Sequence, residues 1–352
     1  MRTKVLLYSC EFPPKKDSGG IGNHAYHLAN QLSLNNYEVH VLSETRDRIT
    51  SNFEVGFELK YIYKLNLHVV NLLKRLFFVF IAANKVEIVF CSGQFQLWFA
   101  PILKLFQPRV KYFAITHGSE LDPQNVFLKR LTRYSLSKFD KIIAVSNYTA
   151  KFIPKEFFNK LTIIPNGIDF NNIPKTNLRL GNQLKLLTVG STSKRKGQIN
   201  VVKSIPLIIK KFPLLRYYMI GSIGYKNEIL LEAQKLNVEK NCILLGKLSD
   251  AELYKYYSSV DIFCMLSEHT VTGDFEGFGI AILEANFFGI PAIGSKGSGI
   301  EDAISDGFNG ILVDPHNVND VKDAIITIME NYDEFEMVWE NQVQNLKKQI
   351  GA

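Results

Sequence analysis

The sequence predicts an α/β protein with two domains, each built around a parallel β-sheet. Its 352 residues are enough for two domains of ordinary size. In both halves short apolar segments alternate with longer helix-compatible segments, which is typical of parallel sheets. Apolar residues make up 46% and charged residues 21% of the chain. This composition is typical of globular proteins and excludes collagen-like, coiled-coil and disordered chains.

The apolar segments give the expected order of strands. They lie at 4–9, 38–42, 86–91, 111–115 and 141–145 in the first half, and at 184–189, 217–220, 242–245, 261–265, 290–293 and 311–313 in the second. A polar stretch at 171–182, after a turn at 165–167, indicates a linker. We therefore expect domains at 1–170 and 183–331. The helix-like segment at 332–352 is a candidate for crossing back onto the first domain.

Cysteine usage and the N-terminus favour a cytoplasmic protein. The four cysteines stand singly, without metal-ligand or redox spacing, which indicates thiols in a reducing compartment; they are Cys10, Cys91, Cys242 and Cys264. The chain runs from Met1 directly into a core strand, so we expect no signal peptide. The apolar run at 76–84 is far shorter than the roughly 20 residues that a membrane-spanning helix needs.

The positive charge is concentrated in the first half. Residues 1–175 contain 23 Lys/Arg and 13 Asp/Glu, whereas residues 176–352 contain 18 and 21. This asymmetry suggests an anionic partner: nucleic acid, a phospholipid surface or a phosphorylated substrate. The alternative is a basic surface that serves only solubility.

A glycine-rich segment at 18–25 is the first candidate site. Glycines at a helix start let a phosphate or sugar approach the backbone N–H groups at the positive end of the helix dipole. Gly20 to Ala25 also fits G-x-G-x-x-A, with Glu44 about 20 residues on, as in dinucleotide-binding proteins. In that pattern the first glycine follows the strand directly, whereas here residues 10–18 intervene. A packing turn without a ligand is the alternative.

The second candidate site is the loop at 190–197. It begins with Gly190 and Ser191, follows a predicted strand, and carries three consecutive cations, Lys194, Arg195 and Lys196. Cations between a glycine and a helix start suit a pyrophosphate. The Walker pattern G-x-x-x-x-G-K-[ST] is absent from the chain, which argues against a P-loop kinase. A surface turn is the alternative.

The third candidate site lies at 267–289. Glu276 is followed by Gly277, Phe278 and Gly279, which we expect to open a helix that carries Glu284. On one helix the two carboxylates would lie about 12 Å apart along the axis. This spacing is too long for a hydrolase's carboxyl pair, but it suits an extended nucleotide sugar whose phosphates lie over the three amides. The alternatives are a carboxylate favoured by the helix dipole and a solvated helix face.

His117 completes the candidate set. It follows the strand expected at 111–115 and precedes Gly118, so it lies at a carboxyl edge where open parallel sheets bind ligands. A structural histidine is the alternative.

Six segments in order resemble the family 4 glycosyltransferases, retaining enzymes of the GT-B architecture. They are GGIGNHAYHLANQL at 19–32, THGSE at 116–120, AVSNYTAKF at 144–152, IPNGID at 164–169, VGSTSKRKG at 189–197 and EGFGIAILEA at 276–285. The last contains the family's E-x7-E motif, and the similarity continues through 289–315. The resemblance covers nearly the whole chain. It implies two facing Rossmann-like domains with an interdomain cleft.

The resemblance also implies residue roles. Glu276 would hold the donor sugar's hydroxyls, Glu284 the ribose, and Arg195 and Lys196 the pyrophosphate, with His117 beside the sugar and the loop of Gly19 and Gly20 reaching the phosphates. The implied reaction moves a hexose from a nucleotide-diphosphate sugar to a glycan or lipid-linked acceptor, in surface polysaccharide or glycolipid synthesis. Front-face attack would retain the anomeric configuration. Fixed cations would replace a divalent metal, since the chain contains no Asp-x-Asp, and no cofactor is expected.

Two departures from the family keep other classes open. Ser191 stands where family members commonly have Arg, and the C-terminal segment is not clearly matched; Arg195 is the candidate substitute for the missing charge. A nucleotide-sugar-binding regulator without turnover is therefore one alternative. An NAD-dependent sugar-modifying enzyme, resting on Gly20 to Ala25 and Glu44, is another.

The acceptor side is expected in the basic first half. Stretches at 71–80 and 126–134 combine cations with apolar residues, which suits a peripheral contact with an anionic cytoplasmic leaflet. Ordinary core helices with cationic outer faces are the alternative. No nucleic-acid partner is expected.

Overall fold

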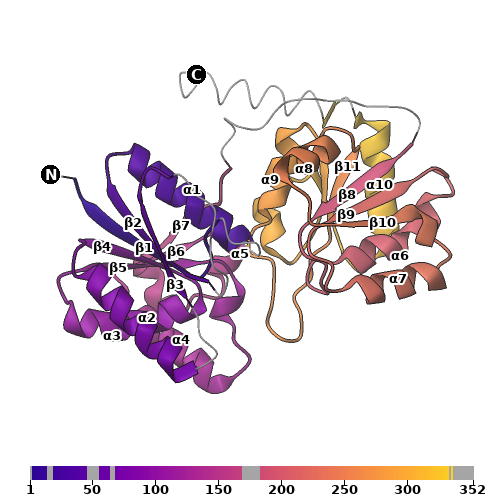
Figure 1. Cartoon of the computed structure of the whole chain (residues 1–352). Helices are drawn as coiled ribbons and strands as arrows, with labels where there is room; N and C mark the ends of the chain where they lie inside the picture. Colours follow the sequence, from indigo (N-terminus) through magenta and orange to yellow (C-terminus); the bar gives the residue numbers. More distant parts are fainter. Residues whose placement is uncertain are drawn as a thin grey trace. The chain divides into compact units, whose positions relative to one another are not determined.

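The computed structural model describes residues 2–13, 19–45, 55–63, 68–168, 183–332 and 334–335. The chain divides into two units, Met1–Gly167 and Ile168–Ala352. Each unit is an α/β domain with one parallel sheet, as the alternating apolar segments predict (Figure 1). The predicted linker at 171–182 and nearly all of the predicted terminal helix at 332–352 lie outside the described residues.

The described part of the first domain contains a seven-stranded sheet in the order β3-β2-β1-β4-β5-β6-β7. Its strands are β1 (Lys4–Ser9), β2 (Glu38–Thr45), β3 (Glu58–Tyr63), β4 (Ile88–Ser92), β5 (Lys111–Thr116), β6 (Lys141–Ala144) and β7 (Leu161–Ile163). The sequence missed β3 and β7. Both are edge strands with mostly exposed or half-buried side chains, so they lack the continuous apolar run that identifies a central strand.

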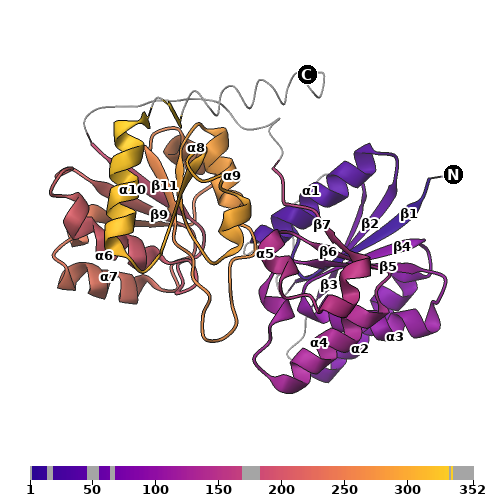
Figure 2. The ribbon, with the colours of Figure 1, turned by 180° about the vertical axis from the view of Figure 1, so that it is seen from behind.

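Helices cover both faces of this sheet. They are α1 (Gly20–Leu34), α2 (His68–Ala83), α3 (Gln94–Phe106), α4 (Val126–Lys138) and α5 (Asn147–Ala150), with 3₁₀ turns at Ser119–Leu121 and Lys155–Lys160. Helix α1 lies on one face, while α2, α3 and α4 lie together on the other (Figures 1 and 2). Tyr8, Leu97 and Tyr112 are among the fully buried side chains that fill the core on the α2–α4 side.

The second domain has a six-stranded sheet in the order β10-β9-β8-β11-β12-β13 within its described residues. Its strands are β8 (Lys185–Val189), β9 (Arg216–Ile220), β10 (Cys242–Gly246), β11 (Ile262–Met265), β12 (Ala292–Ser295) and β13 (Gly310–Val313). The strand order reverses at β8, which pairs with β9 on one side and β11 on the other. Open parallel sheets bind ligands beyond the carboxyl ends of strands at such a switch point. The loops after β8 and β11 therefore occupy the place where a ligand is expected.

Five helices are described in the second domain. They are α6 (Gln198–Ile208), α7 (Lys226–Lys235), α8 (Asp250–Tyr257), α9 (Ile280–Phe287) and α10 (Val318–Glu330), with 3₁₀ turns at Glu239–Asn241 and Gly299–Asp302. Helices α6, α7 and α10 cover one face of the sheet, and α8 and α9 the other (Figure 2).

The helix expected to open at Gly277 begins three residues later, at Ile280. Gly279, with φ at 91°, is the residue before it, in the left-handed region. A backbone in that region cannot continue a right-handed helix, so residues 277–279 form the end of a loop.

Gly197 fixes the approach of the β8 loop to the end of β11. It precedes α6 with φ at 67°. A Cβ atom built there would lie 1.7 Å from the carbonyl oxygen of Leu266, which immediately follows β11. Only glycine permits both the backbone conformation and the contact. This contact holds the loop at 190–197 beside the loop that follows β11.

Gly197→Ala is expected to cost more free energy of unfolding than Gly307→Ala. Both glycines have positive φ, at 67° and 77°, but a Cβ at Gly307 meets nothing within 4 Å. Gly307→Ala should therefore cost only about 1–2 kcal/mol for the left-handed backbone. Gly197→Ala should cost roughly 2 kcal/mol more, because backbone must shift. Urea denaturation measures both, and equal costs would contradict the steric argument.

Candidate functional site

A cluster of buried charges joins two of the predicted loops. Arg195 and Lys196 come from the loop between β8 and α6, and Glu276 comes from the loop between β11 and α9. The Lys196 Nζ lies 2.7 Å from the Glu276 Oε2. An N–H of Arg195 donates to the same oxygen, and the Arg195 Nε lies 3.1 Å from an oxygen of Asp274. The side chains of Lys196 and Glu276 are each only 13% exposed. Three side chains singled out in the sequence thus meet at one point.

Backbone contacts hold these loops in place. The N–H of Glu268 donates to the carbonyl of Arg195 at 2.8 Å, and the N–H of Gly299 donates to that of Glu276 at 2.9 Å. Asp274 is fixed through its backbone to Thr270, whose hydroxyl accepts from the Asp274 N–H at 3.1 Å. The charged side chains are therefore presented by two loops whose backbones are held by several hydrogen bonds.

The cluster sets the protonation state of Glu276. Burial raises the pKa of this carboxyl, but the Lys196 ammonium and the Arg195 guanidinium outweigh burial and lower the pKa to about 2. Burial lowers the pKa of Lys196, and the neighbouring carboxylates raise that of Arg195 despite burial. Glu276 is ionised at neutral pH and accepts hydrogen bonds without donating any.

Glu284 lies on α9 and contacts a different element. The hydroxyl of Tyr257, at the end of α8, donates to the Glu284 Oε2 at 2.9 Å. Tyr257 stacks on Phe288 with ring centroids 5.3 Å apart, which fixes the hydroxyl. Burial raises the pKa of Glu284, and the Tyr257 hydrogen bond opposes this rise. Only Glu284 of the carboxylate pair is helical, so the 12 Å separation expected on one helix does not apply.

The other candidates near the cluster are backbone positions. Gly190 has φ at 142°, and a Cβ there would contact the Lys196 side chain at 3.4 Å. Ser191 is exposed, and its carbonyl accepts from the Gln198 side chain at 3.2 Å. The side chain of Phe278 is buried. Arg195 and Lys196, not the position of Ser191, thus supply the charge beside Glu276.

His117 in the first domain lies within a separate polar group. Its Nε2 is 2.8 Å from the Ser92 hydroxyl, and its ring meets that of His24 edge-on with centroids 5.0 Å apart. The buried carboxylate of Glu120 accepts from the His117 backbone N–H. Ser92 ends β4, His117 directly follows β5, Glu120 lies in the 3₁₀ turn Ser119–Leu121, and His24 lies in the first turns of α1.

Both histidines of this group are neutral at physiological pH. Burial, and to a lesser degree His27, lowers the pKa of His24 to about 4. Burial and the neighbouring His24 lower the pKa of His117 well below its usual value. A neutral imidazole offers one donor and one acceptor nitrogen, so His117 can bond a hydroxyl in either sense.

The glycine loop at the start of α1 is exposed. Gly19 precedes the helix and Gly20 begins it. The backbone N–H of Gly19 donates to a carboxylate oxygen of Glu11 at 2.8 Å. The predicted helix start is confirmed, whereas the phosphate contact stays a prediction.

Glu44 does not have the role that a dinucleotide site requires. It is fully buried, and it accepts from the hydroxyl of Tyr8 at 3.0 Å and pairs with Arg75 at 2.7 Å. A ribose-binding carboxylate must reach the ligand. The structure thus removes one of the two features, Glu44, on which the NAD-dependent alternative rested.

Four polar partners were not assigned from the sequence. His24 lies inside the resembling segment at 19–32, and Asp274 lies inside the candidate site at 267–289, so their positions were the available signal. Ser92 and Tyr257 contact His117 and Glu284 across the fold, and the sequence contains no local pattern that would identify them.

Across the described ranges, no group of three or more His, Cys, Asp or Glu residues could hold a metal ion. Within the same ranges, no helix is both long enough and apolar enough to cross a membrane.

Solved structures assign the fold. Sucrose-phosphate synthase from Thermosynechococcus elongatus matches with a TM-score of 0.78 at 18% identity, over 98% of this chain and 95% of that chain. Anabaena HepE in complex with UDP and glucose matches with a TM-score of 0.76 at 17% identity, over 99% and 95%. Two Rossmann-like domains of this kind define the GT-B fold, which confirms the predicted fold class.

Family models assign the family. The model described as Glycosyltransferase Family 4 matches residues 18–172, and the model described as Glycosyl transferases group 1 matches residues 169–346. The chain belongs to the family 4 glycosyltransferases, which confirms that the protein is a glycosyltransferase. A curated relative, the GDP-mannose-dependent alpha-(1-6)-phosphatidylinositol monomannoside mannosyltransferase of Mycobacterium tuberculosis, is 26% identical over 258 residues, or 67% of each chain.

The histidine pair predicts acid sensitivity. A histidine with a pKa of about 4 in the folded protein and about 6.5 in the unfolded chain makes the unfolded chain the stronger proton binder. The contribution of His24 to the free energy of unfolding is therefore fully present above pH 6.5, and it declines as the pH falls toward 4. Between pH 7.5 and pH 5, wild type should lose roughly 2 kcal/mol more free energy of unfolding than His24→Phe. Urea denaturation at both pH values measures this, and equal losses would contradict it.

Proposed function

We propose that this glycosyltransferase moves a hexose from a nucleotide-diphosphate sugar to a glycan or lipid-linked acceptor, with retention and without a divalent metal. The observation that carries the proposal is the cluster of Arg195, Lys196 and Glu276 at the switch point of the second sheet. It places two fixed cations beside an ionised carboxylate. The cations match the diphosphate on one side of the scissile bond, and the carboxylate matches the hydroxyl groups of the sugar on the other side.

The two cations would act on the leaving group. When the bond from the anomeric carbon to the phosphate oxygen breaks, its electron pair stays on the diphosphate, whose negative charge increases. Arg195 and Lys196 are largely shielded from water, where electrostatic interactions are stronger than in solution. Groups fixed in advance toward a developing charge stabilise the transition state more than the ground state. The cations would then supply the charge stabilisation that a metal supplies in other transferases.

Glu276 would orient the sugar. With a pKa of about 2 it is neither a general acid nor an effective base at neutral pH, but it is a strong hydrogen-bond acceptor. Sugar hydroxyls are donors of the required kind. Glu284 would accept from the ribose hydroxyls, and the amides of 277–279 and of Gly190 would approach the phosphates.

In the first domain, His117 would contact the sugar, and the loop of Gly19 and Gly20 would contact the phosphates. Retention would follow from front-face attack, in which the acceptor oxygen bonds to the anomeric carbon on the side that the diphosphate leaves. The acceptor's proton would pass to an oxygen of the departing phosphate.

The acceptor would be reached from the basic first domain. The mycobacterial relative is named for a phosphatidylinositol mannoside acceptor, which supports a lipid-linked acceptor here. We place the enzyme in the cytoplasm because its cysteines stand singly, as thiols in a reducing compartment do. We place it in peripheral contact with the inner face of the membrane because the first half of the chain carries the positive charge.

Alanine variants of the cluster should greatly slow turnover. Arg195→Ala, Lys196→Ala and Glu276→Ala should each lower the rate of nucleotide diphosphate release from the preferred donor by roughly a hundredfold or more. Lys203→Ala removes an exposed cation from α6, next to the loop, and should leave the rate unchanged. Coupled release assays with and without EDTA make the measurement. Full activity of the Lys196→Ala variant would contradict the mechanism. Loss of wild-type activity on addition of EDTA would also contradict it.

A thermal-shift panel of UDP-, GDP- and ADP-sugars should identify the donor. A ligand that binds only the native state at about 100 times its Kd adds about 2.7 kcal/mol of stability, so one nucleotide should raise the Tm by several degrees. Glu284→Ala should reduce the shift given by the free nucleoside diphosphate. Binding without turnover across plausible acceptors would support the regulatory alternative instead.

A further inference from the structure

We propose that the outer face of α2 and α3, with the first turn of α4, is a docking surface that inserts apolar side chains into an anionic lipid bilayer. The inference rests on the proposed lipid-linked acceptor and specifies how the enzyme reaches it. The sequence alone left open whether these segments were ordinary core helices, and the exposure of their side chains decides between the two readings.

Helix α2 has an apolar outer face. Val79 and Ala83 are fully buried against the sheet. The opposite side should therefore be polar in a helix that meets only water. It carries instead Leu73 and Phe77, each 60% exposed. The rest of the helix has further exposed apolar residues, which are Val69, Val70, Leu72, Phe78, Phe80 and Ile81. Helix α2 thus has apolar side chains on its exposed surface as well as in the core, beside the cations Lys74 and Arg75.

Helix α3 extends this surface. The rings of Phe80 and Phe106 meet edge-on with centroids 6.2 Å apart. The side chain of Gln107 donates to the Phe80 carbonyl at 2.9 Å. The guanidinium of Arg75 lies 4.8 Å from the centroid of Phe95. The exposed apolar residues of α3 are Phe95, Ile102, Leu105 and Phe106. The two helices therefore share one continuous apolar surface, unlike the scattered single residues of ordinary soluble surfaces.

The first turn of α4 adds two more apolar side chains. Val126 is 65% exposed and Phe127 is 72% exposed. Helices α2, α3 and α4 lie on the same face of the sheet (Figure 2), and Trp98 of α3 donates to the Thr132 hydroxyl of α4 at 2.9 Å. All of the apolar residues proposed to insert thus belong to one side of the first domain.

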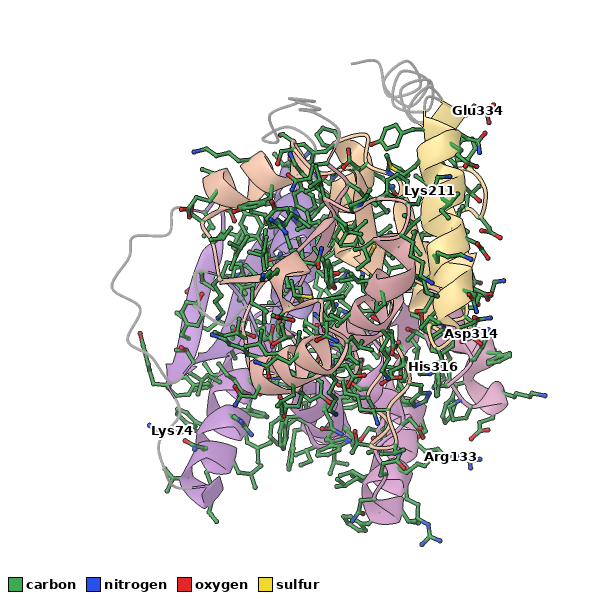
Figure 3. All side chains as sticks on the ribbon, turned by 90° about the vertical axis from the view of Figure 1, so that its right-hand side faces the viewer. Lys74, Arg133, Lys211, Asp314, His316 and Glu334 are labelled. Carbon is green, nitrogen blue, oxygen red and sulfur yellow. The ribbon has the colours of Figure 1, made fainter. Side chains whose placement is uncertain are left out.

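The positive charge of these three helices favours an anionic partner. Together they contain no Asp or Glu, and their cations are Lys74, Arg75, Lys104, Lys129, Arg130, Arg133 and Lys138. Figure 3 labels Lys74 on α2 and Arg133 on α4, both at the periphery of the domain. Several of the cations pair with carboxylates from other elements, as Lys104 does with Asp140. Exposed apolar residues with basic neighbours are the composition of surfaces that lie in the interface of anionic membranes.

A second copy of this chain is a poorer occupant. Two copies that met through this face would bring the same cations together, and like charges across an interface oppose association. An anionic bilayer both accepts the apolar side chains and neutralises the cations.

Vesicle co-sedimentation tests the proposal. The purified chain should bind vesicles of phosphatidylcholine with about one third phosphatidylglycerol, and bind pure phosphatidylcholine vesicles far less. Leu73→Ser with Phe77→Ser should reduce partitioning roughly tenfold or more, because two exposed apolar anchors are lost. Leu214→Ser with Leu231→Ser, exposed leucines of the second domain, is the matched control and should bind as wild type. Lys74→Glu with Arg130→Glu should remove the preference for anionic vesicles.

Insertion is measured with Phe77→Trp. Its fluorescence should shift to the blue with anionic vesicles and be quenched by brominated acyl chains. No binding by the wild type at low salt, equal binding by the Leu73 and Phe77 variant, or loss of a dimer in light scattering by that variant would each overturn the proposal.

Donor hydrolysis without vesicles keeps this result separate from the proposed function. The Leu73 and Phe77 variant should hydrolyse the donor at the wild-type rate, since neither residue belongs to the charged cluster. Wild type that binds vesicles but never turns over a donor would contradict the proposed reaction and leave the docking surface supported. Wild type that turns over a donor but binds no vesicles would do the reverse.

Discussion

The ion cluster of Arg195, Lys196 and Glu276 is the constraint on which the rest of the second domain's site depends. Charges shielded from water are costly unless each has a partner, and removing one partner leaves the other uncompensated. The two loops must therefore meet closely, and Gly197 permits that meeting because it has no Cβ to strike Leu266. The same cluster orients both cations in the absence of a ligand, so the diphosphate that we propose as their ligand would lose less free energy in ordering them. The same ion pairs thus hold the two loops together and keep both cations oriented.

Much of the fold follows from the sequence, because central parallel strands are covered on both faces and appear as apolar runs. Strands β3 and β7 lie at the edge and lack this signal. The glycine loops and the charged residues could be located by their place after strands, but their partners could not. Asp274 and Tyr257 reach Arg195 and Glu284 through tertiary packing. The start of α9 was misplaced because spacing alone does not reveal that Gly279 adopts a left-handed backbone.

The two domains use polar burial in opposite ways. In the second, opposite charges are held together and stay ionised, with the pKa of Glu276 at about 2. In the first, His24 and His117 are buried side by side without a close carboxylate on their rings among the described contacts, and both lose their protons. Fixed cations can bind a diphosphate, whereas a neutral histidine can form a hydrogen bond with a hydroxyl. The outer helices of the first domain then supply what neither polar group can: apolar surface with positive charge around it.

Every charged member of the cluster belongs to the second domain, and this has a consequence for how such enzymes diversify. The charged residues proposed to bind the donor are encoded within a single folding unit, while the surface proposed to meet the acceptor's lipid carrier is encoded in a different one. Substitutions that retune one need not disturb the other. Exchange of whole domains between relatives would then produce new pairings of sugar and carrier. Each domain has its own hydrophobic core, so each can stay folded after such an exchange.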